Sequence, residues 1–168
     1  KAFSTKHNEK WESISTQDYV NQSNQLSRGL LKLGIQPNDK IAVISSTNRT
    51  EWNICDIGIL QIGAQDVPIY PTASEADYNF IFNDASIKLC IVSDQELYEK
   101  VLRVKPGVES LGEVYTFDEV EGAKNWKELL ALGEDDSNQS EVEKLMADVK
   151  TEDLATLIYT SGTTGTPK

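Results

Sequence analysis

Short apolar runs alternate with stretches of helical periodicity along most of the chain, and this alternation constrains the fold more than any other feature. The runs are rich in β-branched residues and bounded by polar turns, which is typical of buried strands. They are expected at residues 40–45, 65–71, 87–93, 112–117 and 154–160. Strand–helix–strand units of this length predict an α/β fold with a mainly parallel sheet and helices on both faces.

The helices between these strands carry recognisable start signals. Residues 52–63 are apolar around nearly the whole helix circumference, so this helix is expected to be buried between layers. Asn48 and Glu51 are spaced like a capping box ahead of it, and Ser93 and Glu96 are spaced in the same way ahead of another helix. Further helices are expected at residues 15–32, at 74–84 with Ser74 as the N-cap, at 125–132, and after the acidic loop 133–143.

Composition excludes several classes of function. The formal net charge of −11 repels phosphate backbones and anionic membrane surfaces, so no nucleic-acid partner is expected. No apolar stretch is long enough to span a bilayer. The single histidine, His7, leaves no room for a histidine-based triad, and no metal site is expected. Cys55 and Cys90 lack metal-site spacing and are expected to be buried thiols of a cytoplasmic protein.

The chain closes on "LIYTSGTTGTPK", Leu157 to Lys168, where an apolar strand turns into a loop of Ser, Thr and Gly. Glycines let successive backbone N–H groups point at one anion, hydroxyl groups add donors, and Lys168 adds a positive charge. This chemistry suits a polyphosphate. The loop is not a Walker loop, because Pro167 stands where that motif needs its second glycine. It leaves its strand at the carboxyl edge of the sheet, where ligands bind in such folds.

The order of these residues is similar to a known signature. "YTSGTTGTPK" resembles the phosphate loop of the AMP-forming adenylating enzymes, namely acyl-CoA synthetases, luciferases and peptide-synthetase adenylation domains. Residues 27–52 and 56–94 resemble upstream blocks of the same superfamily. Within the second block "VPIYPT" is most similar to the long-chain fatty acyl-CoA branch. The resemblance covers residues 11–168.

The resemblance implies which residues hold the nucleotide. Tyr159 fits either a support for the incoming strand or a core aromatic, whereas residues 70–72 fit a structural turn after a strand. Asp66 departs from the apolar or small residue usual before Val-Pro, and we expect it to be a solvent-exposed carboxylate at a strand edge. The residues implied to line the β- and γ-phosphates of ATP are Thr160, Ser161, Gly162, Thr163, Thr164, Gly165 and Lys168.

The implied reaction is that of an ATP-dependent long-chain fatty acid–CoA ligase. The carboxylate of a fatty acid, or of another carboxylic acid, attacks the α-phosphate to give an acyl-adenylate and pyrophosphate, usually with Mg²⁺, and CoA then displaces AMP. The adenine segment, the threonine–glutamate motif, the ribose aspartate and the C-terminal lysine of the superfamily have no counterpart here. We therefore expect residues 1–168 to be part of the large N-terminal domain, ending at the phosphate loop 159–168.

Such a piece is expected to be inactive alone, to contain no catalytic residue and to hold no bound cofactor. Peripheral membrane association is an option for the parent enzyme only. An aryl- or amino-acid-adenylating enzyme of the same superfamily is the nearest alternative. A flavodoxin-like module is an alternative of another class, since "SSTNRTE", Ser45 to Glu51, could hold a flavin phosphate at a helix N-terminus. Capping and turn formation is the preferred interpretation of that stretch.

Overall fold

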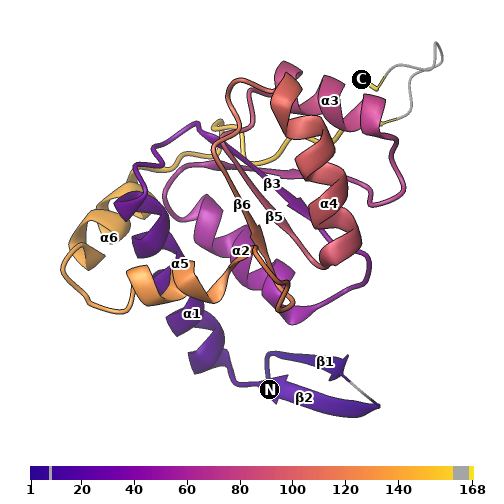
Figure 1. Ribbon diagram of the computed structural model, residues 1–168. Helices are drawn as coiled ribbons and strands as arrows, with labels where there is room; N and C mark the ends of the chain where they lie inside the picture. Colours follow the sequence, from indigo (N-terminus) through magenta and orange to yellow (C-terminus); the bar gives the residue numbers. More distant parts are fainter. Residues whose placement is uncertain (8, 161–166) are drawn as a thin grey trace.

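A five-stranded parallel sheet forms the centre of the chain, and helices pack on both of its faces (Figure 1). The computed structural model describes residues 1–7, 9–160 and 167–168. Within them the strand order is β4-β3-β5-β6-β7, and the predicted α/β fold is confirmed. The strands are β1 (Phe3–His7), β2 (Lys10–Ile14), β3 (Lys40–Ile44), β4 (Gln65–Pro68), β5 (Leu89–Val92), β6 (Glu113–Thr116) and β7 (Lys124–Asn125). The helices are α1 (Thr16–Lys32), α2 (Thr50–Leu60), α3 (Glu75–Asp84), α4 (Gln95–Val104), α5 (Lys127–Leu132) and α6 (Gln139–Asp148), with a 3₁₀ turn at Lys105–Gly107.

The sheet separates two hydrophobic cores. Successive side chains of a strand point to opposite faces, so Ile41 and Val43 of β3 pack with α1, α2 and α5, whereas Ala42 and Ile44 pack with α3 and α4. Figure 1 shows the two groups of helices on opposite sides of the strands. Because both faces are covered, the strands read as apolar runs rather than as alternating patterns. Across the described residues, no helix is both long enough and apolar enough to cross a membrane.

Helices α1 and α5 approach each other closely at two glycines. A Cβ atom at Gly29 would lie 2.1 Å from the carbonyl oxygen of Leu129, and one at Gly133 would lie 1.8 Å from the carbonyl oxygen of Gln25. Arg28 is buried beside this contact and donates from Nε to the Gly133 oxygen at 2.7 Å. Only residues without a side chain permit this separation of the two backbones.

The helix starts confirm one predicted cap and correct another. Ser74 caps α3 as predicted: its Oγ accepts from the Asp77 N–H at 3.1 Å, and the Asp77 carboxylate accepts from the Ser74 N–H at 2.9 Å. The predicted box led by Ser93 is wrong, because α4 begins one residue later. Its N-cap is Asp94, which accepts from the Leu97 N–H at 3.1 Å. Asp94 caps the helix through this bond, and Ser93 Oγ accepts from the Ser46 N–H instead.

An N-terminal hairpin that the sequence did not predict caps α2. The predicted role of Asn48 is wrong, since the N-cap of α2 is Arg49 and its side chain makes no capping bond. The amide of Thr50 donates instead to Oγ1 of Thr5 in β1 at 3.0 Å. Strands β1 and β2 pair antiparallel. They carry few apolar residues, so no hydrophobic pattern in the sequence predicts them.

The strand predicted at residues 154–160 is a further correction. The structure shows only an isolated parallel bridge there, where the Asp66 N–H donates to the Ala155 oxygen at 3.1 Å and the Leu157 N–H donates to the Asp66 oxygen at 3.2 Å. The next ladder donor on β4 would be Pro68, which has no N–H. The segment therefore lies along the edge of the sheet without forming a regular strand.

Candidate functional site

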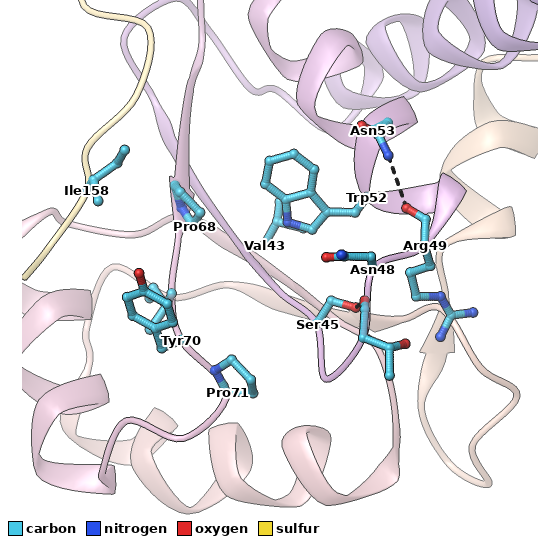
Figure 2. Close-up of a pocket in the computed structure, with 12 residues that line it drawn as sticks. Val43, Ser45, Asn48, Arg49, Trp52, Asn53, Pro68, Tyr70, Pro71 and Ile158 are labelled. Carbon is cyan, nitrogen blue, oxygen red and sulfur yellow. Dashed lines mark hydrogen bonds between the residues drawn. The ribbon is translucent and has the colours of Figure 1, made fainter. Parts of the chain in front are cut away.

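A large cavity lies at the carboxyl ends of β3 and β4. Its volume is about 620 Å³. Figure 2 shows Trp52 and Asn48, at the start of α2, on one side and Tyr70 on the other, with Ile158 at the far wall. Tyr70 is 70% exposed and Ile158 is 63% exposed, so two walls of the cavity are apolar surface open to solvent. This is the sheet edge at which α/β folds bind their ligands.

A second cavity lies between the turn after β4 and the base of the closing loop. Its volume is about 250 Å³, and its walls include Thr72, Tyr159, Thr160 and Pro167. Tyr70 lines both cavities. The turn therefore stands between the large cavity and the loop that the sequence singles out.

The two ends of the closing loop are joined by backbone hydrogen bonds. The Thr160 N–H donates to the Lys168 oxygen at 2.9 Å, and the Lys168 N–H donates to the Thr160 oxygen at 3.0 Å. Lys168 is exposed, and no ion pair to it is found among the described residues. Of the predicted site, the structure thus brings together Thr160 and Lys168. The predicted residues that lie outside the described part of the chain are Ser161, Gly162, Thr163, Thr164 and Gly165.

Tyr159 anchors the chain just before the loop. Its hydroxyl group donates to Oδ2 of Asp84 at 2.5 Å, and its ring meets Phe80 edge-on with centroids 6.5 Å apart. Burial and the neighbouring Asp84 carboxylate raise the pKa of Tyr159 well above its usual value. Tyr159 also packs on the core beside α3 and α4, so it is both a support for the incoming segment and a core aromatic.

The turn at residues 70–72 has the structural role expected of it. The Tyr78 hydroxyl donates to the Tyr70 oxygen at 3.3 Å. Lys100 donates to the backbone oxygens of Pro71 and Ala73, and its ammonium group lies 4.4 Å from the centre of the Tyr78 ring. The turn is thereby fastened to α3 and α4, and it presents Tyr70 to the cavities.

The loop after β3 is tied to its neighbours by polar contacts. The Ser46 N–H donates to Ser93 Oγ at 2.9 Å, and Ser46 Oγ donates to Asp94 at 2.6 Å. These bonds join the loops after β3 and β5, the crevice where a flavodoxin-like module would bind its ligand. Several polar groups of "SSTNRTE" thus bond within the protein, which agrees with the turn formation in the preferred interpretation but not with capping by Asn48.

Arg49 completes this network, and sequence reasoning missed it. Its guanidinium group forms ion pairs with Glu51 at 2.8 Å and Asp118 at 2.9 Å, and it lies 5.2 Å from the centre of the Phe117 ring. Burial lowers the pKa of Arg49, but the hydrogen bonds and charges of both carboxylates outweigh it and raise the pKa overall. Asp118 is distant in sequence, so no local spacing could have identified the pair.

The structure contradicts the predicted solvent exposure of Asp66. Its side chain is on the face of β4 that packs against α2, and the residue is only 1% exposed. Oδ1 is buried, and no hydrogen-bond partner for it is found among the described residues. Burial, together with the negative charge of Asp56, raises the pKa of Asp66 to about 8. The prediction failed because α2 covers the face of β4 on which the Asp66 side chain lies, and residues 155–157 bond along the strand edge. Cys55 is fully buried, as predicted.

Comparison with known proteins gives a consistent result. Residues 2–168 match the family model described as AMP-binding enzyme. The chain is 29% identical to the long-chain-fatty-acid–CoA ligase ACSBG2 of Xenopus laevis and 32% identical to the long-chain-fatty-acid–CoA ligase FadD15 of Mycobacterium bovis. These alignments cover 99% and 94% of the chain but 23% and 26% of the relatives. The chain thus spans about a quarter of the length of these curated relatives.

A solved structure shows the same fold. The anthranilate CoA ligase AuaEII in complex with anthranoyl-AMP superposes with a TM-score of 0.78 at 22% identity, over 94% of this chain and 29% of that one. The fold, the closing signature and the match over residues 2–168 agree. The chain belongs to the AMP-binding enzyme family.

Proposed function

We propose that the chain is part of an ATP-dependent long-chain fatty acid–CoA ligase and that residues 159–168 supply its phosphate loop. The single observation that carries the proposal is the sequence "YTSGTTGTPK" at the carboxyl edge of the sheet, with its ends joined at Thr160 and Lys168. Relatives that are 29% and 32% identical are long-chain-fatty-acid–CoA ligases. We also propose that residues 1–168 are a partial N-terminal domain of this ligase.

The residues fit the phosphates of ATP. Thr160, Ser161, Thr163 and Thr164 offer hydroxyl donors, Gly162 and Gly165 allow the backbone to approach an anion, and Lys168 is an exposed cation at the base of the loop. Hydrogen bonds from charged groups to phosphate are stronger than neutral ones, so Lys168 is expected to contribute most. ATP supplies the α-phosphate that the substrate carboxylate attacks. The chain's part is to hold the β- and γ-phosphates so that pyrophosphate leaves in line.

A lysine substitution in the ligase that contains this sequence tests this role. Lys168→Ala should lower kcat/KM for ATP by about 10- to 100-fold, because a hydrogen bond to a charged group is worth roughly 1.5–3 kcal/mol. Lys150→Ala is the matched control, since Lys150 is also an exposed lysine of the C-terminal segment, and it should change kcat/KM less than twofold. A Lys168→Ala enzyme with wild-type kcat/KM would contradict the proposed role.

The acyl substrate is tested by pyrophosphate exchange with one acid of each class. Palmitate should support ATP–pyrophosphate exchange best if the long-chain assignment holds, and CoA should then convert the adenylate to a thioester. Faster exchange with anthranilate or L-aspartate would favour an aryl- or amino-acid-adenylating enzyme instead. The 168-residue chain alone should catalyse neither step, and turnover by it would overturn the proposal that it is only part of the enzyme.

A further inference from the structure

Asp66 is a buried carboxyl group in an unusual place. It lies on β4, the strand at the end of the five-stranded sheet, and is 1% exposed. Its register partner on β3 is Ile41, and α2 covers the same face with Cys55 and Asp56. In the part of the chain that the structure describes, Oδ1 has no hydrogen-bond partner. The backbone hydrogen bond from Val67 favours the charged form of the Asp66 carboxyl group, but burial outweighs it. A charged carboxylate at such a site therefore loses more hydration than it recovers, whereas a neutral carboxyl group loses far less.

The same residue holds the segment that leads to the phosphate loop. The Asp66 N–H donates to Ala155 and the Asp66 oxygen accepts from Leu157, and the bridge between them pairs Asp66 with Thr156. No titratable side chain occurs among residues 154–158. The titratable groups that face Asp66 are therefore Asp56 and Cys55, both from α2. Asp56 is of like charge, so it opposes ionisation of Asp66 further.

The position of the segment determines how Asp66 can become hydrated. On one side β4 is bonded to β3, and α2 closes the face of the sheet. The remaining side is the edge of β4, and residues 155–157 cover it with two backbone hydrogen bonds. Water can reach an ionised carboxylate with least disruption if these residues leave. Ionisation of Asp66 and docking of the segment are then mutually exclusive.

We propose that Asp66 is a positioning residue for the phosphate loop: its neutral carboxyl group keeps residues 155–160 docked on β4, and its ionisation releases them. The link to nucleotide binding rests on the proposed function of residues 159–168, but the docking itself does not. The sign follows from linkage. The pKa of Asp66 is about 8 in the folded protein and near the ordinary value of 3.8 in a released chain, so docking is strongest below about pH 4 and weakens progressively as the pH rises to about 8.

Amide hydrogen exchange followed by NMR in the 168-residue chain, without nucleotide, tests the proposal. In the wild type, the protection factor of the Leu157 amide should fall more than tenfold between pH 5 and 8, after correction for intrinsic exchange. The amides of Cys90 to Val92 in β5 should stay strongly protected and serve as the internal reference. Asp66→Asn, which mimics the neutral form, should make Leu157 protection independent of pH. Asp56→Asn should move the transition to lower pH, because it removes the like charge.

Three results would overturn the proposal. They are Leu157 protection in the wild type that does not change with pH, the same pH dependence in Asp66→Asn, and an equal fall of protection throughout β5. Titration of the ¹³C-labelled Asp66 carboxyl in the wild type needs no variant, and its midpoint should coincide with the end of the fall in Leu157 protection. A midpoint near 4 contradicts the proposal. Because ATP is absent, none of these results depends on whether residues 159–168 bind phosphate.

Discussion

Two segments at the carboxyl edge of the sheet are held in very different ways. The loop of residues 45–49 after β3 is fixed by bonds to Ser93, Asp94 and Asp118, and the side chain of Arg49 is only 8% exposed. The segment 154–160 is held by two backbone bonds to β4 and by the Tyr159 hydroxyl. Its Leu154 and Ile158 are 52% and 63% exposed.

This difference indicates how stability is distributed in the chain. Regions with few buried apolar contacts open locally at low free-energy cost, whereas core strands open only with global unfolding. Residues 154–160, which carry the phosphate loop, are therefore expected to open locally. The loop of residues 45–49, which is bonded to residues after β5 and β6, is expected to open only together with the core strands. Substitutions in the sheet and the helices packed on it should therefore affect amide protection in β5. Substitutions in residues 154–160 should affect protection only within that segment, for example at Leu157.

The largest effect is expected from Gly29→Ala. The new Cβ would lie 2.1 Å from a backbone oxygen of α5, so two helices must separate. Overpacking that moves backbone is expected to lower the free energy of unfolding by about 3 kcal/mol or more. Urea unfolding measures this, and the local protection of Leu157 should stay nearly unchanged. The control is Gly122→Ala, where the site is open and only the φ of +78° opposes a side chain, so the cost should be about 1 kcal/mol.

Removal of the buried guanidinium group should have the next largest effect. Arg49→Met leaves Glu51 and Asp118 without their shared cation, and we expect a loss of about 2–3 kcal/mol in the free energy of unfolding. Arg103→Met removes an exposed pair with Glu75 and should cost less than about 1 kcal/mol in the same urea titration. If both variants lost the same free energy of unfolding, the burial of Arg49 would add nothing to the stability of the loop of residues 45–49.

The sequence predicted what local patterns encode. Apolar runs located β3, β4, β5 and β6, and the Ser74 cap is a matter of neighbouring residues. It could not predict contacts made by distant parts of the chain. The cap of α2 comes from Thr5, and the partner of Arg49 is Asp118, each supplied by another element of the fold. The predicted exposure of Asp66 failed for the same reason, because α2 covers its face of β4 and residues 155–157 bond along its edge.

The smallest effect is expected from Tyr159→Phe, and it tests the comparison most directly. The substitution removes the hydrogen bond to Asp84 but keeps the ring contact with Phe80, so it should weaken docking of the segment by about 0.5–1 kcal/mol. Hydrogen exchange should show a two- to fivefold fall in the protection of Leu157 at pH 7, with β5 unaffected. Asp84→Asn keeps an acceptor for the tyrosine hydroxyl and should cost less. An equal fall of protection in β5 and at Leu157 in Tyr159→Phe would contradict this. Residues 154–160 would then unfold together with the sheet and its helices, and their local opening could not be separated from global unfolding.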